Sequence, residues 1–308
     1  MVRPLSKSPL TLLLSGLAMI AFAGNSVLAR LALGSDSIDA ASFSSIRFTA
    51  GALTLVLVMA IKGWFQSGTS DSSVNNSENI SVGWIPAIVL LFYSITFSAA
   101  YQVLEAGAGA LLLFGSVQVT MILAALKRGE RLDLAEGLGA MLALIGLVYL
   151  ILPKFETPSW LGAVMMLCSG AAWGLYSLLG QTVRRPLAAS TENFVRSLPL
   201  IWGFNLLSFA DVHISPAGIW PAIVAGSITS GLGYVIWYIA LRSLSATLAA
   251  TIQLSIPILA AMGGVLWLQE KLSLHLLISA SIVLGGITIA LLSRKNRGDR
   301  QETLSPER

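Results

Sequence analysis

The sequence predicts an all-α integral membrane protein with ten transmembrane helices, arranged as two inverted five-helix repeats. Three observations predict this fold: the apolar composition, the number of long apolar segments, and a partial duplication of the chain. Of the 308 residues, 55% are hydrophobic and 11% are charged, and the mean hydropathy is +0.79. A soluble domain averages about 25% charged residues. This composition therefore excludes an ordinary water-exposed surface.

Ten apolar segments are each long enough to form a transmembrane helix, since about 20 apolar residues cross the hydrocarbon core. They cover residues 10–32, 39–61, 83–103, 107–126, 132–152, 159–181, 192–209, 217–240, 246–268 and 273–292. One long polar connection, 63–81, is rich in Ser and Asn, and we expect a flexible cytoplasmic loop. The predicted organisation is a cytoplasmic N-terminus (1–9), a first repeat (10–152), a second repeat (153–292) and a disordered cytoplasmic tail (293–308).

The two halves of the chain share short sequences at corresponding places. Glu130-Arg131-Leu132 recurs as Glu270-Lys271-Leu272, each time before an apolar segment, and Pro86-Ala87-Ile88-Val89 recurs as Pro221-Ala222-Ile223-Val224. Each half holds five predicted spans, an odd number, so we expect the two copies to be inverted in the membrane. A duplicated helical bundle of this kind is typical of transporters, with the solute site between the copies.

Basic residues gather in the connections on the same side as the N-terminus. They are Arg3, Lys7, Lys62, Lys127, Arg128, Arg131, Arg184, Arg185, Arg242 and the tail Arg294-Lys295-Asn296-Arg297. The opposite side keeps Arg30, Arg47, Lys154 and Lys271. The positive-inside rule therefore predicts that both termini are cytoplasmic in a cell inner membrane. The net charge of +4 comes from these short segments and does not indicate a nucleic-acid partner.

The N-terminal segment imitates a signal peptide, with basic residues, an apolar run and Ala21-Phe22-Ala23. However, Phe22 to Ser26 aligns with Trp173 to Ser177 in the second half. Because the segment belongs to the repeat, we expect it to be retained.

Several short motifs follow one another in an order that resembles a known family. They are Arg47-Phe48 early in the second span, Tyr101-x-x-Leu104 and Tyr238-x-x-Leu241 before the fourth and ninth, Glu-x-Leu after each of these, and Trp173-Gly174 in the sixth. This order resembles the EamA family of the drug/metabolite transporter superfamily, from about Leu10 to Leu292. The resemblance implies an inner-membrane carrier whose central cavity is lined by spans one, three, four, six, eight and nine. It also implies export of amino acids or other small metabolites.

The halves also differ, which predicts an asymmetric cavity. The first half carries Phe22-Ala23 where the second has Trp173-Gly174, and Val119-Thr120 where the second has Ile256-Pro257. That part of the first half is also about three residues shorter.

Polar and aromatic residues within the spans are the candidates for a solute site, because buried polar groups in a bilayer must face a cavity or each other. The substrate-binding candidates are Asn25, Arg47, Tyr101, Gln118, Trp173, Tyr176, Tyr234, Trp237, Tyr238 and Gln253. Tyr93, Thr96, Asn205 and Ser230 are further polar residues within spans. The aromatic candidates could form cavity walls, or they could lie in the interfacial belts that Trp and Tyr favour.

Gln118 and Gln253 lie at nearly equivalent places in the two halves. An amide both donates and accepts hydrogen bonds, so the pair could hold a zwitterion or polar metabolite from two sides. The alternative is interhelical hydrogen bonding with no ligand.

Arg47 lies about 12 Å inside the second span at 1.5 Å per residue. We expect its side chain to snorkel, or to pair with Asp39 or Glu105 on the same side. The alternative is that it attracts a substrate carboxylate. Pro257 within the ninth span removes a backbone hydrogen bond, and is a candidate for a kink or a hinge.

Motifs for other chemistry are absent from the sequence. There is no phosphate-binding Gly-x-x-x-x-Gly-Lys-Ser/Thr loop, catalytic serine elbow or His-Glu-x-x-His. His213 and His275 have no Cys or Glu at metal-ligand spacing, and one cysteine, Cys168, cannot form a disulfide within the chain. We therefore expect no cofactor, no metal and no enzymatic activity.

The expected function is a secondary transporter that exports amino acids or related compounds by alternating access. The expected partners are a small-molecule solute and the lipid bilayer, and a homodimer is left open. A carrier for cationic drugs is disfavoured because no carboxylate lies at a span centre to neutralise a cation. An intramembrane lipid-modifying enzyme and a non-transporting scaffold are the alternatives from other classes.

Overall fold

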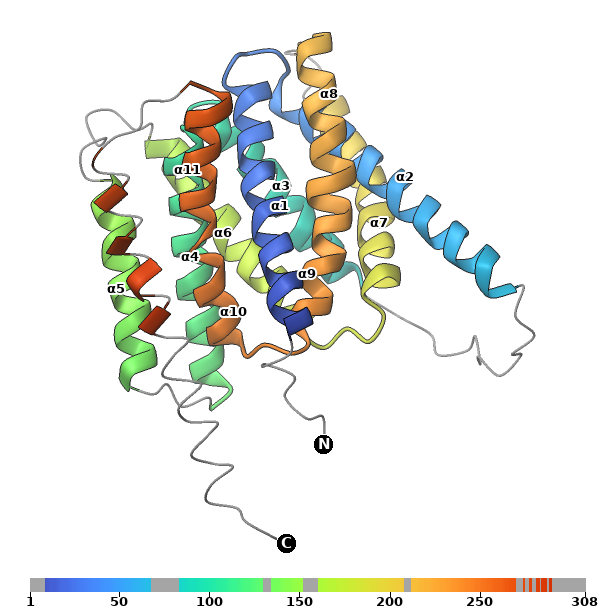
Figure 1. Cartoon of the computed structure of the whole chain (residues 1–308). Helices are drawn as coiled ribbons and strands as arrows, with labels where there is room; N and C mark the ends of the chain where they lie inside the picture. The colour runs from blue at the N-terminus through green and yellow to red at the C-terminus, as the bar shows by residue number, and fades with distance from the viewer. Residues whose placement is uncertain are drawn as a thin grey trace, which may run out of the picture.

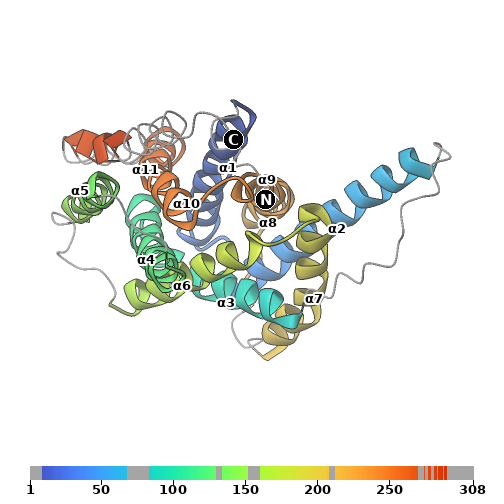
Figure 2. The same cartoon turned by 90° about the horizontal axis from the view of Figure 1, so that it is seen from below.

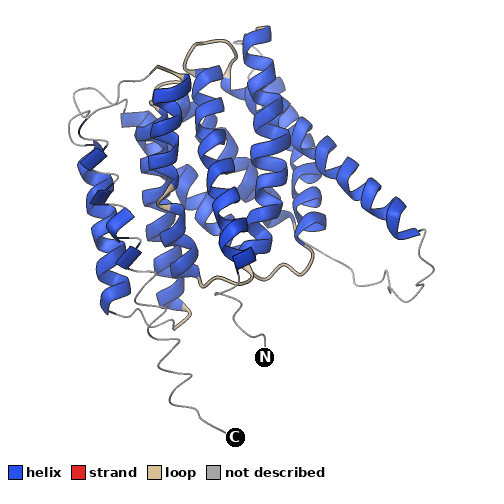
Figure 3. Cartoon of the chain, in the orientation of Figure 1, coloured by secondary structure: helices blue, strands red, loops and turns tan. Residues whose placement is uncertain are grey.

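The architecture is a bundle of long helices, from which α2 leans outward at its far end (Figures 1 and 3). In this computed structural model, residues 9–67, 83–129, 134–151, 160–207 and 212–269 are described, together with scattered positions between 274 and 289. The first half contains α1 (Pro9–Leu33), α2 (Ala40–Ser67), α3 (Trp84–Tyr101), α4 (Ala106–Lys127) and α5 (Leu134–Ile151). The second half contains α6 (Trp160–Gly180), α7 (Pro186–Leu207), α8 (Pro216–Val224), η3 (Ala225–Leu232), α9 (Gly233–Leu241), α10 (Ala246–Gln253) and α11 (Ile256–Trp267).

Seven helices among the described residues are long and apolar enough to cross a membrane. They cover Pro9–Leu33, Ala40–Gly63, Trp84–Tyr101, Ala106–Lys127, Trp160–Gly180, Pro216–Leu241 and Leu248–Trp267. Large apolar side chains such as Leu12, Leu57 and Ile88 are exposed on the outer surface, as expected of helices surrounded by lipid. The chain is a multi-pass membrane protein.

Three of the ten predicted spans fall outside these seven. Within α5, a shorter apolar helix covers Gly137–Gly146. The last predicted span, 273–292, lies largely outside the described residues, as do residues 1–8, most of the predicted loop 63–81 and the tail.

Two predicted boundaries were wrong. The span expected at 192–209 begins six residues earlier, at Pro186, because proline suits the first position of a helix and needs no backbone hydrogen-bond donor there. Its first turns carry Thr191 and Asn193, which are buried against other helices and so can be polar. The loop expected from residue 63 begins later, since α2 continues to Ser67.

The eighth predicted span is one rod built from α8, η3 and α9, of which η3 is a π-helix. Its glycines allow close approach to α2: a Cβ on Gly226 would lie 2.0 Å from the carbonyl oxygen of Arg47, and a Cβ on Gly51 would lie 3.0 Å from that of Gly226. The backbones of α2 and η3 therefore touch, and this contact joins the two halves. Short π-helical segments are frequent at functional sites.

The ninth predicted span is interrupted between α10 and α11. Leu254 and Ser255 donate backbone hydrogen bonds to residues three positions earlier, Thr251 and Ile252, in place of a regular helical pattern. Pro257 has no N–H to donate to the carbonyl of Gln253, which is the physical reason for a break at this place.

Viewed from below, α5 lies at one edge of the bundle and α2 and α7 lie at the other (Figure 2). Between them, α1, α3, α4, α6, α9 and α10 surround the centre (Figure 2). The aromatic core lies there, where helices of the first half pack against helices of the second.

Candidate functional site

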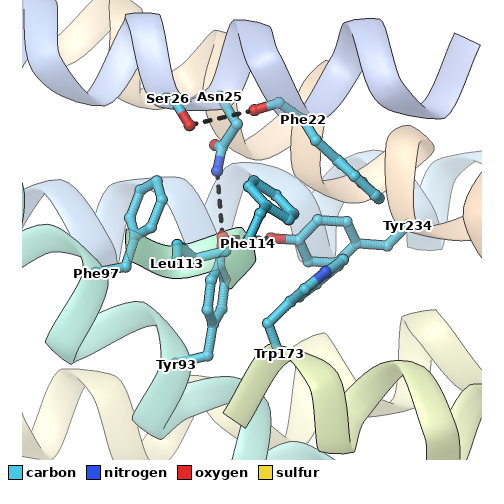
Figure 4. Close-up of a pocket in the computed structure, with 9 residues that line it drawn as sticks. All are labelled: Phe22, Asn25, Ser26, Tyr93, Phe97, Leu113, Phe114, Trp173 and Tyr234. Atoms are coloured by element: carbon cyan, nitrogen blue, oxygen red, sulfur yellow. Dashed lines mark hydrogen bonds between the residues drawn. The ribbon is translucent and has the colours of Figure 1, made fainter. Parts of the chain in front are cut away.

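A small cavity lies among the central helices, where the two halves meet (Figure 4). Its lining comes from α1, α3, α4, α6 and α9, with the side chains Phe22, Asn25, Ser26, Tyr93, Phe97, Leu113, Phe114, Trp173 and Tyr234. These helices correspond to five of the six spans that the family resemblance implies. An apolar and aromatic wall with a few converging polar groups is typical of a small-molecule site. The cavity volume is about 10 Å³, room for roughly one water molecule.

Aromatic rings from both halves interlock around this cavity. Phe22 packs edge-on against Trp173, with ring centroids 5.0 Å apart, and against Tyr234 at 5.8 Å. Trp173 also lies 5.2 Å from the Tyr93 ring and 4.7 Å from the Tyr234 ring. Such pairs contribute about 0.5–1.5 kcal/mol each beyond the burial of their surface. The rings therefore form a continuous wall shared by α1, α3, α6 and α9.

Arg47 neither snorkels nor pairs with a neighbouring carboxylate, so that prediction was wrong, whereas contact with a substrate carboxylate stays a prediction. Its side chain is fully buried and turned toward the second half. Asp39 instead caps α2, where Oδ1 accepts from the backbone N–H of Ser42 at 2.8 Å, and Oδ2 accepts from that of His213 at 3.1 Å. Within the described residues Arg47 forms no ion pair, with Asp39, Glu105 or any other carboxylate.

Arg47 is the centre of a polar network that joins the halves. Its Nε donates to Ser230 Oγ at 2.9 Å, and its Nη2 donates to the hydroxyls of Tyr234 at 2.7 Å and Tyr93 at 3.4 Å. Asn25 Nδ2 donates to the Tyr93 hydroxyl at 3.4 Å, as Figure 4 shows, and Asn25 Oδ1 accepts from Ser230 Oγ at 3.4 Å. The π-helix η3 and the helix that follows it thus supply the second half's share of this network.

Gln253 supports the cavity wall from behind. Its Oε1 accepts a hydrogen bond of 2.8 Å from Trp173 Nε1, and its Nε2 donates to the carbonyl of Ala249 at 3.2 Å and to Met121 Sδ at 3.4 Å. Because the amide orients the indole ring, Gln253 holds Trp173 in the position where the ring lines the cavity.

The amide of Gln118 contrasts with that of Gln253. It is fully buried, and neither its Nε2 nor its Oε1 has a hydrogen-bond partner in the part of the chain that the structure describes. An unpaired buried polar group costs about 1–3 kcal/mol of stability. An amide with two such atoms is therefore a candidate for a side chain that forms its hydrogen bonds with a ligand, or in another conformation of the protein.

The two glutamines are not at equivalent depths. Gln118 lies twelve residues after Ala106, the first residue of α4, whereas Gln253 lies seven residues after Ala246, the first residue of α10. The difference of five residues corresponds to about 7.5 Å along a helix axis.

The four remaining ring candidates are fully buried beside the cavity but do not line it. They are Tyr101, Tyr176, Trp237 and Tyr238. Each is tied to the protein by a hydrogen bond: Tyr101 to the carbonyl of Ala106, Tyr176 to Asn193, Trp237 to Ser177, and Tyr238 to the carbonyl of Tyr176. They extend the aromatic wall rather than forming its surface. Among the described residues, no three His, Cys, Asp or Glu side chains gather as a metal site.

Sequence reasoning missed several residues of the cavity. Tyr93 and Ser230 were recognised as polar residues within spans, and in the structure both accept hydrogen bonds from Arg47. Phe22, Phe97 and Phe114 line the cavity as well. A phenylalanine within an apolar span carries no signal that separates a cavity wall from ordinary core.

Comparison with known proteins assigns the family. Two stretches, residues 9–152 and 160–292, match the model of the EamA-like transporter family. The chain belongs to the EamA-like transporter family, within the drug/metabolite transporter superfamily, and contains two EamA units. It is therefore a transporter and not an enzyme.

Relatives and a solved structure cover most of the chain. An uncharacterized protein of Pseudomonas aeruginosa is 45% identical over 94% of this chain and 98% of its own length. A probable terminal-alkyne amino-acid exporter of Streptantibioticus cattleyicolor is 24% identical over 73% of this chain and 78% of its own. A crystal structure with 20% identity matches 90% of this chain and 98% of its own with a TM-score of 0.67, which shows that the fold is shared.

Proposed function

We propose that this protein is a secondary carrier that exports amino acids or related small metabolites by alternating access between two inverted five-helix repeats. The observation that carries the proposal is the cavity between the halves, with its aromatic wall and the network around Arg47, Tyr93 and Tyr234. A site at the interface of two repeats is what alternating access requires, because motion of one repeat against the other then opens it to either side.

The direction of the helices supports inversion of the repeats. In Figure 1, α1 begins at the lower side of the bundle, and the connection from α6 to α7 lies at that side too. The first helices of the two halves, α1 and α6, therefore run in opposite directions. The connection that carries Arg184 and Arg185 lies with the start of α1, which favours a cytoplasmic N-terminus.

The amino-acid class of solute rests on two points. A distant relative is a probable amino-acid exporter, and the cavity offers hydroxyl and amide groups beside aromatic rings. A carrier for cationic compounds fits less well, because the buried charge nearest to the cavity is the cation of Arg47.

The narrow cavity favours a closed state of such a carrier. A space for about one water molecule cannot hold an amino acid, so the halves have to separate for a solute to enter. The break between α10 and α11, next to Pro257, and the π-helix η3 are the places where we expect helices to bend.

Flux through purified protein tests the proposal. Proteoliposomes loaded with one radiolabelled amino acid at a time should release at least one of them faster than liposomes without protein. The matched variant Trp173→Ala, which removes the largest ring of the cavity wall, should reduce that release at least ~10-fold if the wall contacts the solute. Release equal to that of protein-free liposomes for all twenty amino acids would contradict the proposal.

A further inference from the structure

Among the residues that the structure describes, no buried anion accompanies the buried cation of Arg47. Its side chain has no solvent exposure, and within the described part of the chain its hydrogen bonds go to the hydroxyls of Ser230, Tyr93 and Tyr234. Removing a charge from water costs several kcal/mol, which neutral hydroxyls offset only in part. Ionisable residues inside a membrane are accordingly rare and usually functional.

One edge of the buried guanidinium group is incompletely hydrogen-bonded. Nε and Nη2 donate hydrogen bonds, but Nη1 has no partner among the described residues. The two terminal nitrogens of a guanidinium match the two oxygens of a carboxylate, which accept two parallel hydrogen bonds. A carboxylate on this edge would give Nη1 its missing partner and supply the opposite charge.

The guanidinium group lies next to the cavity. The guanidinium carbon lies 5.1 Å from the ring centroid of Phe97 and 5.5 Å from that of Tyr93, and Nη2 contacts the Tyr234 hydroxyl. All three of these rings line the cavity. A solute in an enlarged cavity therefore reaches Arg47 once the two tyrosine hydroxyls turn aside, and those hydroxyls can then donate to the carboxylate as well.

The second half offers no matching cation. Arg47 lies seven residues after the start of α2 at Ala40, and Asn193 lies seven residues after the start of α7 at Pro186. The residues that follow them, Phe48 and Phe194, stack on each other at 5.2 Å. Because the counterpart of Arg47 is a neutral amide, a carboxylate has one preferred place, on the α2 side of the site.

We propose that Arg47 binds the carboxylate group of the transported solute, so that the substrates are zwitterions or organic acids and not amines or amides. This inference rests on the proposed transport function and names the chemical group that the site recognises. The aromatic wall of Phe22, Phe114 and Trp173 then faces the remainder of the solute and suits an apolar side chain.

Two matched sets of ligands test this inference by calorimetric titration of the detergent-purified protein. The first is L-phenylalanine, 3-phenylpropionate, L-phenylalaninamide and 2-phenylethylamine, and the second is the corresponding set for L-leucine. We expect the acids to bind, and the amides and amines to bind at least ~10-fold more weakly, as is typical when a buried charge loses its partner. Amides that bind as tightly as the acids, or a set in which nothing binds, would overturn the inference.

Variants separate recognition from folding. Arg47→Gln should remove the preference for acids. Arg47→Lys should keep part of it, since an ammonium group retains the charge but cannot donate the two parallel hydrogen bonds of a guanidinium group. Arg196→Gln is the control: Arg196 pairs with Glu192 and lies over the Trp84 ring, away from the cavity lining. It should keep the wild-type preference, whereas an unchanged preference in Arg47→Gln would overturn the inference.

Flux measurements distinguish failure of the inference from failure of the proposed function. If the acids bind but no amino acid is released from proteoliposomes, the carboxylate site stands and the transport proposal fails. If amino acids are released and their amides are released at the same rate, transport stands and the role of Arg47 is wrong.

Discussion

At the scale of single residues, two buried glutamines differ in their hydrogen bonding. This difference distinguishes a residue that stabilises the fold from one that is a candidate for ligand binding. Both amide atoms of Gln253 are bonded, to Trp173, Ala249 and Met121. Both amide atoms of Gln118 are without hydrogen-bond partners within the described ranges. A residue that stabilises the fold satisfies its polar atoms, whereas a residue kept for a ligand can leave them unsatisfied at a cost in stability.

Replacement of each glutamine by methionine, which has a similar shape but no amide, should therefore have opposite effects on stability. Gln253→Met should lower the free energy of unfolding by about 1–3 kcal/mol, because Trp173 Nε1 loses its acceptor. Gln118→Met should leave it unchanged or raise it, because two unpaired polar atoms disappear. Thermal unfolding in detergent ranks the two variants.

The double variant Trp173→Phe/Gln253→Met removes both partners of the hydrogen bond and serves as the control. Its loss of stability should be smaller than the sum of the two single losses. Additive losses, or a Gln118→Met variant that is less stable than Gln253→Met, would contradict this account.

At the scale of elements, the contact between α2 and η3 positions Arg47 against the second half. Gly226 lies so close to the Arg47 backbone that a methyl group has no room, and Ser230 and Tyr234, which bond the guanidinium, follow in the same rod. The distance between these two elements therefore decides whether Arg47 reaches its partners.

Gly226→Ala should push α2 away from η3 and disrupt both folding and flux, because a Cβ would lie 2.0 Å from a backbone oxygen that cannot rotate away. Gly115→Ala is the matched control, since nothing lies within 4 Å of a Cβ at that position of α4. It should retain flux and gain about 0.5–1 kcal/mol from the loss of a helical glycine. The two variants are compared by size-exclusion chromatography and by flux in proteoliposomes. A Gly226→Ala protein that is monodisperse and active would show that the close contact between α2 and η3 is not required.

At the scale of the whole molecule, a connection within the first half contacts a connection within the second half at the upper side of the bundle in Figure 1. Ile38, between α1 and α2, forms an antiparallel bridge with Ile214, which precedes α8. Ser215 donates backbone and side-chain hydrogen bonds to the carbonyl of Ser37, at 2.9 and 2.8 Å. If the halves rock against each other, this contact has to break whenever the site opens to that side.

A disulfide across this contact should therefore stop transport. Ser37→Cys with Ser215→Cys, in a Cys168→Ser background, places two thiols at opposite positions of an antiparallel bridge, a separation that a disulfide can span. Oxidation should abolish flux in proteoliposomes, and a reducing agent should restore it. The single cysteine variants and the Cys168→Ser background should retain flux under both conditions, and unimpaired flux in the crosslinked protein would show that this side does not open.

Much of the architecture could be predicted because it depends on properties that act locally along the chain. Apolar length predicted the positions of α1, α3 and α4 within a few residues, and the duplicated motifs predicted the family that comparison then confirmed. The same local signal failed at α7, whose first turns are polar because they face other helices instead of lipid.

The sequence by itself determined that the protein crosses a membrane many times and is built from two related transporter units, since composition, span length and motif order need no knowledge of which helices touch. Only the tertiary structure decided that Arg47 turns away from Asp39 and toward Tyr93, Tyr234 and Ser230. It also decided that Gln253 is satisfied while Gln118 is not. These contacts join residues up to 187 positions apart. They depend on the rotation and register of one helix against another, which cannot be read from a single sequence.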